Sequence, residues 1–162
     1  MIDRIKILVN LIIEKLLIVL MAVMVLNVLW QVFTRFILND PSSFTEELAR
    51  YLLIWVGLIG AGYVTGKKMH LAIDYVINKF DDKKRFVINI FINVCTFSFA
   101  LFAMLIGGIN LVSLILYLEQ ISAALQIQLG YVYLAVPISG ILIMFYSAVN
   151  IIEQFQRLNK SN

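Results

Sequence analysis

Long apolar runs separated by short polar links fill most of this chain. Four of the runs are long enough to cross a bilayer as helices, because one crossing takes about 20 predominantly apolar residues. We therefore expect four spanning helices, at residues 11–38, 44–66, 86–118 and 129–152. The third run would be about 50 Å long at a rise of about 1.5 Å per residue, so it must tilt, protrude or bend at Gly107 and Gly108.

Two local features add to this pattern. Over residues 70–80, apolar side chains recur at helical spacing, with polar side chains on the opposite side. This predicts a short amphipathic helix in the membrane interface between the second and third spans, although a solvated connector with one apolar side would show the same pattern. Pro137 lies inside the fourth run and should kink it by removing one backbone hydrogen bond.

The composition agrees with a location in the membrane. Hydrophobic residues make up 62% of the chain and charged residues 14%, against about 45–50% and about 25% in soluble domains. Four spans and their links use nearly all of the 162 residues. We expect an all-α membrane protein with a single domain, residues 1–162, and no separate soluble domain.

Positive charges are distributed unequally between the two ends of the spans. All but two of the 13 lysines and arginines lie in the termini or the central link, the exceptions being Arg35 and Arg50. Because positive residues stay on the cytoplasmic side, both termini should be cytoplasmic. Residues 1–29 resemble a signal peptide in outline, but the apolar run is too long and has no small-residue cleavage site, so we expect an uncleaved first span.

Few residues in this chain could carry catalytic chemistry. The single cysteine, Cys95, cannot form an intramolecular disulfide, and the single histidine, His70, excludes a haem held between paired histidines. No cysteine, histidine or carboxylate group has the spacing of metal ligands. We expect no catalytic, cofactor or metal site, which argues against a membrane oxidoreductase or an intramembrane hydrolase. We also expect no nucleic-acid partner.

Charged residues gather where the first run ends and the second begins, between Trp30 and Trp55. Asn27, Gln31 and Arg35 follow one another at intervals of four residues, which places them on one helical face. Polar side chains inside a span usually face protein, so we expect this face to point away from lipid.

The second run opens with Ser43, and Glu46 follows three residues later. This spacing matches a capping box, in which the hydroxyl and the carboxylate bond the first free amides of a helix. Glu46 and Glu47 are four and three residues before Arg50, so either could pair with it within the helix. Alternatively, these charges only cap helix ends at the membrane interface, where exposed charges contribute little.

Five segments of the chain together form a recognisable series: Trp30-Gln31-Val32-Phe33-Thr34-Arg35, Thr45-Glu46-Glu47-Leu48-Ala49-Arg50, Trp55-Val56-Gly57-Leu58-Ile59-Gly60-Ala61, His70-Leu71-Ala72-Ile73-Asp74 and Tyr133-Leu134-Ala135-Val136-Pro137. In their order and spacing, these segments resemble the small membrane subunit of tripartite ATP-independent periplasmic (TRAP) transporters, the DctQ-like family. The resemblance covers nearly the whole chain and is greatest to the members that serve sialic acid uptake.

The resemblance implies a non-catalytic scaffold in the bacterial inner membrane. In this family the small subunit binds a large membrane subunit, which carries the substrate and sodium sites, and helps to receive the periplasmic substrate-binding protein. No cofactor is then expected in this chain. We expect eight residues to support the hairpin and its contact with the large subunit: Trp30, Gln31, Arg35, Ser43, Glu46, Glu47, Arg50 and Trp55.

Two further hypotheses concern the other end of the spans. Lys83, Lys84 and Arg85 could contact anionic phospholipid headgroups, although a topology signal alone would account for them. A self-contained four-helix, proton-coupled exporter would need an acid deep in the first span. The one candidate, Glu14, lies near the membrane boundary beside Lys15.

Overall fold

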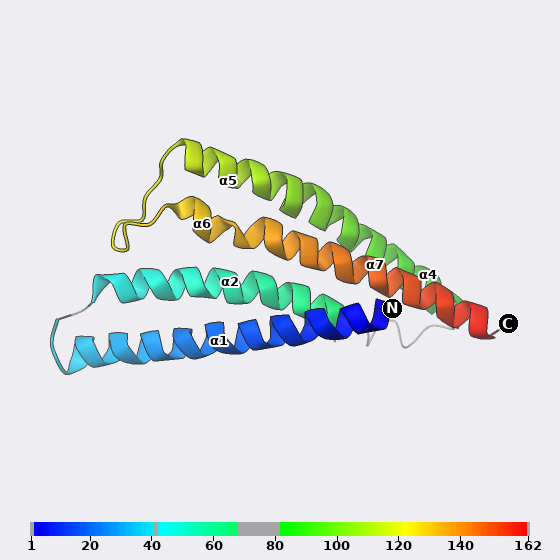
Figure 1. Ribbon diagram of the computed structural model, residues 1–162, viewed down its shortest axis with the longest axis horizontal. Coiled ribbons are helices and arrows are strands. Elements are labelled where there is room, and N and C mark those ends of the chain that lie inside the picture. The colour runs from blue at the N-terminus through cyan, green and yellow to red at the C-terminus, as the bar shows by residue number, and fades with distance from the viewer. Residues whose placement is uncertain (1, 41, 68–81, 162) are drawn as a thin grey trace.

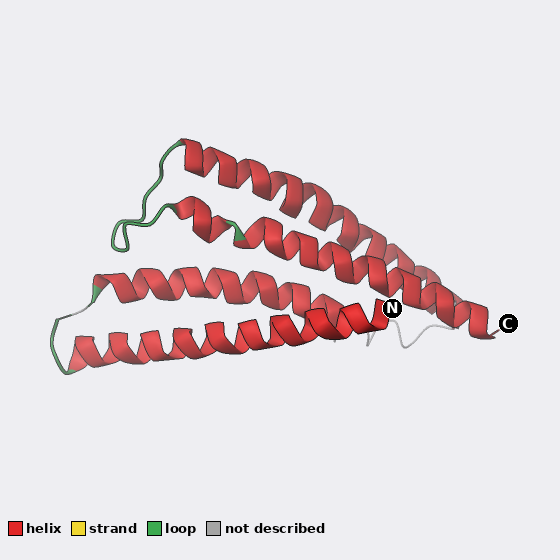
Figure 2. Ribbon diagram, viewed as in Figure 1, coloured by secondary structure: helices red, strands yellow, loops and turns green. Residues whose placement is uncertain are grey.

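The computed structural model describes residues 2–40, 42–67 and 82–161, and this part of the chain is helical apart from its links (Figure 1, Figure 2). Its elements are α1 (Ile2–Phe36), α2 (Ser43–Lys67), α4 (Asp82–Phe99), η1 (Ala100–Ile106), α5 (Gly107–Tyr117), α6 (Leu129–Tyr133) and α7 (Ala135–Ser161). Four stretches of the described residues are long and apolar enough to span a membrane, as predicted: Arg4–Phe36, Ser43–Lys67, Lys84–Tyr117 and Leu129–Gln156. The amphipathic helix predicted at residues 70–80 lies outside the described residues.

The helices lie side by side in a row. α1 packs on α2, α2 packs on α7, and α7 packs on both α4 and η1. Figure 1 shows α6 and α7 between α2 on one side and the continuous stretch of α4, η1 and α5 on the other. Both described links lie at the end of the row where the helices spread apart. Both termini lie toward the other end, where the helices converge. We call these the wide end and the narrow end.

Three helices meet toward the narrow end around three buried side chains: Ile13, Ile59 and Tyr146. Tyr146 is fully buried, and its hydroxyl donates a hydrogen bond of 2.6 Å to Oδ1 of Asn10. Lys6 forms an ion pair with Glu153 of α7. These contacts use the first turns of α1, which explains why the helix begins at Ile2 and not near residue 11, where hydropathy alone places the start of the span.

Small residues of α2 allow α7 to approach closely. A Cβ atom at Gly66 would lie 2.5 Å from the ring of Tyr146, and one at Gly62 would lie 3.2 Å from Cβ of Leu142. Gly62 and Gly66 therefore admit another helix of the same chain. Gly57 lies on the same helix, yet no atom lies within 4 Å of its Cβ position.

The third spanning stretch changes helix type where it meets α7. The seven residues of η1 are π-helical and end immediately before Gly107, so the widened turns adjoin the predicted point of adjustment. Gly140 of α7 packs directly on this segment. A Cβ atom there would lie 2.9 Å from Cβ of Met104 and 3.3 Å from the carbonyl oxygen of Ala100. A side chain at position 140 would therefore force the two helices apart.

The fourth spanning stretch is interrupted at Leu134, between α6 and α7 (Figure 2). Pro137 has no amide hydrogen and cannot bond the carbonyl of Tyr133, four residues earlier. The chain continues through bonds of 3.2 Å from the Leu134 amide to Gly130 and from the Ile138 amide to Leu134. The helix expected to kink at Pro137 is thus interrupted about one turn before it.

Gly66→Ala should destabilise the protein, whereas Gly57→Ala should not. At position 66 the added methyl group meets the buried ring of Tyr146, and overpacking of this kind costs about 1–3 kcal/mol. At position 57 the methyl group has room, and alanine favours a helix over glycine by up to about 1 kcal/mol. Thermal unfolding of both variants in the same detergent measures the difference. An equal loss of stability at both positions would contradict the close α2–α7 contact.

Candidate functional site

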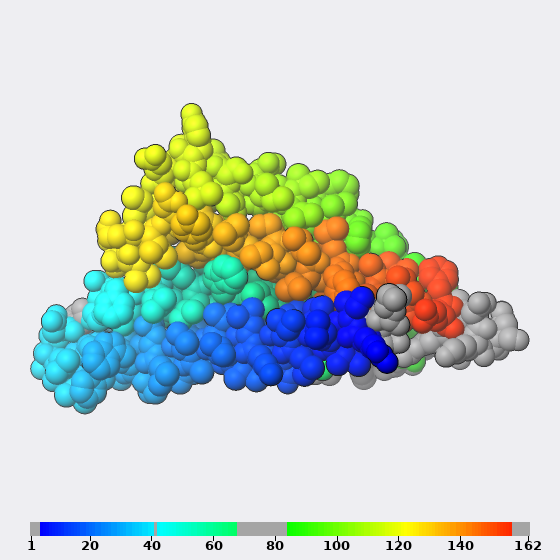
Figure 3. Space-filling view, in the orientation of Figure 1, coloured from blue at the N-terminus to red at the C-terminus, as the bar shows by residue number. Residues whose placement is uncertain are grey.

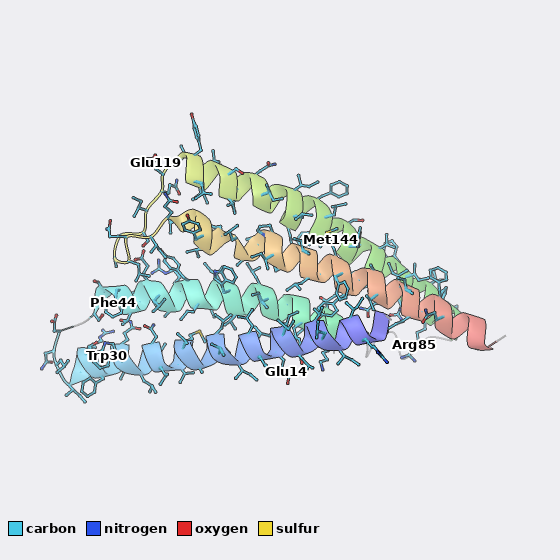
Figure 4. The ribbon with its side chains drawn as sticks, in the orientation of Figure 1. Glu14, Trp30, Phe44, Arg85, Glu119 and Met144 are labelled. Atoms are coloured by element: carbon cyan, nitrogen blue, oxygen red, sulfur yellow. The ribbon has the colours of Figure 1, made fainter. Side chains whose placement is uncertain are left out.

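The wide end contains the link between α1 and α2, and with it most of the predicted cluster (Figure 4). Asn27 is buried, and its amide donates a bond of 2.7 Å to the carbonyl of Thr45, so the predicted polar face of α1 does meet α2 at this level. Gln31 is half-buried. Arg35 is exposed, with its guanidinium carbon 5.9 Å from the centre of the Phe36 ring. The polar face of α1 therefore contacts α2 at Asn27, whereas Arg35 at its end is exposed.

The first turn of α2 differs from the predicted capping box. Ser43 is itself helical and exposed. Thr45 is fully buried, and its hydroxyl donates a bond of 2.7 Å to the carbonyl of Ser42. The carboxylate of Glu46 reaches forward to Arg50 at 3.4 Å, and both side chains are about two-thirds exposed. The reciprocal bonds between Ser43 and Glu46 do not form, because the helix begins one residue too early for that geometry.

Glu47 has a different environment from Glu46. Its carboxylate accepts hydrogen bonds from the backbone amides of residues 123–125, at 3.2, 2.8 and 2.9 Å in chain order. The hydroxyl of Tyr51 donates a further bond of 2.7 Å. Both carboxylate oxygens are thus engaged, and the pair predicted between Glu47 and Arg50 is not formed. Bonds to an ionised acceptor are stronger than neutral ones, so this contact joins α2 firmly to the link between α5 and α6.

That link is folded so that three successive amides face one carboxylate. Two of its residues, Glu119 (φ 49°) and Gln126 (φ 55°), have the left-handed conformation that reverses the chain direction. The Ser122 amide bonds the Ile127 carbonyl at 2.9 Å across the link. Within the described residues, the amides of 123–125 have no backbone acceptor, so the carboxylate satisfies donors that the turn leaves free.

Sequence reasoning missed this contact for a physical reason. Backbone amides of a turn carry no residue-type signature, and they lie 76 to 78 positions after Glu47. Figure 3 shows the atoms of the α5–α6 link lying against the start of α2. The one available signal is the spacing of Glu47 and Tyr51, which indicates a polar pair on one face but does not identify what that face meets.

The two tryptophans of the cluster have different roles. Trp30 is half exposed and stacks on Phe33, with 5.8 Å between ring centres. Trp55 is partly buried and packs against the Ile13, Ile59 and Tyr146 cluster. Trp55 therefore stabilises the chain internally, whereas Trp30 presents an aromatic surface to the outside.

The opposite end holds the residues with a predicted lipid role. Lys84 and Arg85 are exposed near the start of α4, and Figure 4 labels Arg85 at the narrow end. The side chain of Lys83 lies outside the described residues. The two described cations are thus free to meet an anionic surface at this end.

Glu14 is exposed on α1 and accepts a bond of 3.2 Å from the Tyr63 hydroxyl. It is therefore not the buried acid that a self-contained proton-coupled exporter needs. In the part of the chain that the structure describes, no group of three or more histidine, cysteine, aspartate or glutamate residues could hold a metal ion.

Comparison with known protein families shows to which of them this chain belongs. The model of the tripartite ATP-independent periplasmic transporters, DctQ component, matches residues 24–157. The chain belongs to the DctQ family. The matched region begins within α1 and ends within α7, so it contains both links and the Glu47 contact.

Three relatives illustrate the family. The chain is 27% identical over 126 residues to the sialic acid TRAP transporter small permease protein SiaQ of Vibrio cholerae, covering 78% of this chain and 71% of the relative. It is 32% identical over 102 residues to the C4-dicarboxylate TRAP transporter small permease protein DctQ of Rhodobacter capsulatus, covering 62% and 44%. It is 31% identical over 119 residues to the sialic acid TRAP transporter permease protein SiaT of Haemophilus influenzae.

The match to SiaT covers 71% of this chain but 18% of SiaT, so the shared segment is a small part of a much longer permease. Family membership and the four spanning helices together make this DctQ component a small TRAP permease subunit and a multi-pass membrane protein. The family is a transporter component and not an enzyme.

Glu47→Gln should loosen the α5–α6 link while leaving the helices intact. The amide group of glutamine directs its own donors at the backbone donors of residues 123–125, so part of the contact is lost. Hydrogen exchange measured by mass spectrometry should speed up at Ala124 and Leu125. Glu46→Gln, which changes an exposed carboxylate one residue away, should leave that exchange unchanged. Equal exchange in the two variants would contradict the contact.

Proposed function

We propose that this DctQ component is the small scaffold subunit of a sodium-coupled TRAP transporter for uptake of a carboxylate, and that the substrate is sialic acid. The family match over residues 24–157 is the observation that carries the proposal, because it includes the second, third and fourth spans and the C-terminal part of the first. Two of the three relatives described above are named for sialic acid transport. In this proposal the large permease subunit binds substrate and sodium, and this chain holds no cofactor.

The proposal places the chain in the bacterial inner membrane with the wide end toward the periplasm. Both described links lie at that end and both termini at the other, as an even number of spans requires (Figure 1). The exposed Lys84 and Arg85 at the narrow end suit the cytoplasmic side. The amphipathic helix at residues 70–80, and headgroup contact by Lys83, Lys84 and Arg85, belong to the same proposal.

A scaffold role is supported by how little of the first two spans the chain buries by itself. Among the α1 residues whose exposure is described, only Ile13, Asn27 and Thr34 are buried, and the most apolar window of the second span has 17% of its residues buried. A row of helices offers a partner a broad surface without unfolding or rearrangement. We propose that this chain binds and braces the large permease subunit along that row.

The wide end suits a second role, which is to help dock the periplasmic substrate-binding protein. Three backbone bonds to Glu47 hold the α5–α6 link in one shape, and the link exposes Glu119 and Ile121 at its surface. A loop held before binding loses less conformational freedom on contact than a mobile one. Glu47 acts in this proposal as a positioning residue and not as a contact residue.

Reconstitution tests the transport role. Liposomes that contain the cognate large permease together with this chain should take up labelled sialic acid when the binding protein and an inward sodium gradient are present. Liposomes with the large permease alone, or with this chain alone, should not. Uptake that is equally fast without this chain would contradict a scaffold function, and uptake of a dicarboxylate instead would redefine the substrate.

Docking has a separate test in the same liposomes. Glu47→Gln should raise the concentration of binding protein needed for half-maximal uptake, because the α5–α6 link loses its fixed shape. The maximal rate should stay close to that of the wild type, since the large permease is unchanged. Glu46→Gln serves as the matched control. A normal half-saturating concentration in Glu47→Gln would remove the link from the docking surface.

A further inference from the structure

One face of α2 is covered by no other part of the described chain. Its members follow one another at intervals of three or four residues and are all exposed: Glu46, Arg50, Leu53, Gly57, Ala61 and Val64. We call this set the free face of α2. The opposite face of the helix carries the buried Ile59, Gly62 and Gly66, which pack on α7 and α1.

Glycine at the free face is unusual for this chain. A Cβ atom at Gly62, Gly66, Gly108, Gly130 or Gly140 would lie within 3.2 Å of a neighbouring atom, so each of these glycines makes room for a close contact. Gly57 and Gly60 have no atom within 4 Å of the Cβ position. A glycine inside a helix costs up to about 1 kcal/mol relative to alanine, so it normally has a packing reason. At Gly57 and Gly60 no part of the chain that the structure describes supplies that reason.

The exposed surface of α1 has the opposite character. It presents large aliphatic side chains along its length, among them Leu8, Ile12, Val19, Leu26 and Leu29, each more than half exposed. Such a surface suits lipid chains, which conform to irregular bulky side chains. Helices that associate within a membrane instead use small residues, because these allow two backbones to approach. Of these two exposed surfaces, the free face of α2 is therefore the one shaped for a protein helix.

The free face also continues into the charged cluster. The Glu46–Arg50 ion pair lies at its wide-end terminus, with both side chains about two-thirds exposed. Arg50 precedes Gly57 by seven residues, which is about 10 Å along the helix axis. A helix seated on Gly57 and Ala61 would reach this pair near the membrane surface. Charges at the rim of an interface set its register and its choice of partner more than its strength.

We propose that the free face of α2 seats a transmembrane helix of the large TRAP permease subunit, with Gly57 and Ala61 at the closest approach and the Glu46–Arg50 pair at the rim. The proposal rests on the scaffold role above and adds the place of contact. SiaT supports this choice of partner. In SiaT, a segment 31% identical to this chain makes up 18% of a far longer permease, so a single chain carries both that segment and the rest of the permease. Two bulky residues, Leu53 and Val64, flank the small ones and would fill the grooves of the incoming helix.

The test is co-purification of the large permease with a tagged form of this chain after co-expression. Leucine at both small positions, Gly57→Leu with Ala61→Leu, should reduce recovery of the large subunit by about tenfold, because side chains then occupy the space for the incoming backbone. The variant chain should keep its own unfolding temperature, since both positions are open. Ala22→Leu, at an exposed alanine on α1, is the matched control and should leave recovery unchanged.

Photo-crosslinking gives a second measurement that does not depend on a disruptive variant. A photoreactive residue at Leu53 should crosslink to the large subunit, whereas one at Leu26 on α1 should not. If the wild-type chain recovers no large subunit, the scaffold function itself is wrong. If the wild type recovers it, the leucine variant recovers it equally and Leu53 gives no crosslink, then the scaffold function stands and the free face is the wrong surface.

Discussion

The contact between α2 and α7 joins the two helical hairpins of this chain. Gly66 and Gly62 remove the side chains that would otherwise separate the helices, and the ring of Tyr146 occupies the space at Gly66. The hydroxyl of that ring then bonds Asn10 of α1, so one buried tyrosine connects three helices. Because lipid competes equally well for apolar side chains, close packing and buried hydrogen bonds must hold such helices together. The other helix contacts extend the row from this point.

A second junction, at the wide end, is polar. Glu47 satisfies three backbone donors of the α5–α6 link, and Asn27 bonds the carbonyl of Thr45. Backbone groups that a turn leaves free near a membrane are costly unless a side chain or water meets them. The carboxylate therefore organises the link and fixes it to α2 at once. The first junction lies toward the narrow end of the row and the second lies at the wide end, so the helices are joined near both ends.

The two faces of α2 have different surroundings within the chain. One face is used within the chain, at Ile59, Gly62 and Gly66, and the other is left open at Gly57 and Ala61. This division suits a DctQ component, a family of transporter subunits that do not act as enzymes. In the proposed scaffold role, a fixed shape and an open helix face matter more than reactive groups. The charged cluster that dominates the sequence is accordingly split, with Glu47 directed inward and Glu46 and Arg50 directed outward.

The sequence by itself determined the class of the protein, the number of its spanning helices and the break near Pro137. These follow from hydrocarbon thickness, from helical periodicity and from the missing amide of proline, all of which act locally. The helical start at Ile2, the π-helical η1 and the partners of Glu47 were decided by tertiary structure. Each depends on a helix or link distant in the chain, and a turn's backbone amides look the same in every sequence. Gly57 and Gly66 illustrate what the sequence leaves open. Both are glycines of α2, but only Gly66 lies on the side of the helix that α7 covers.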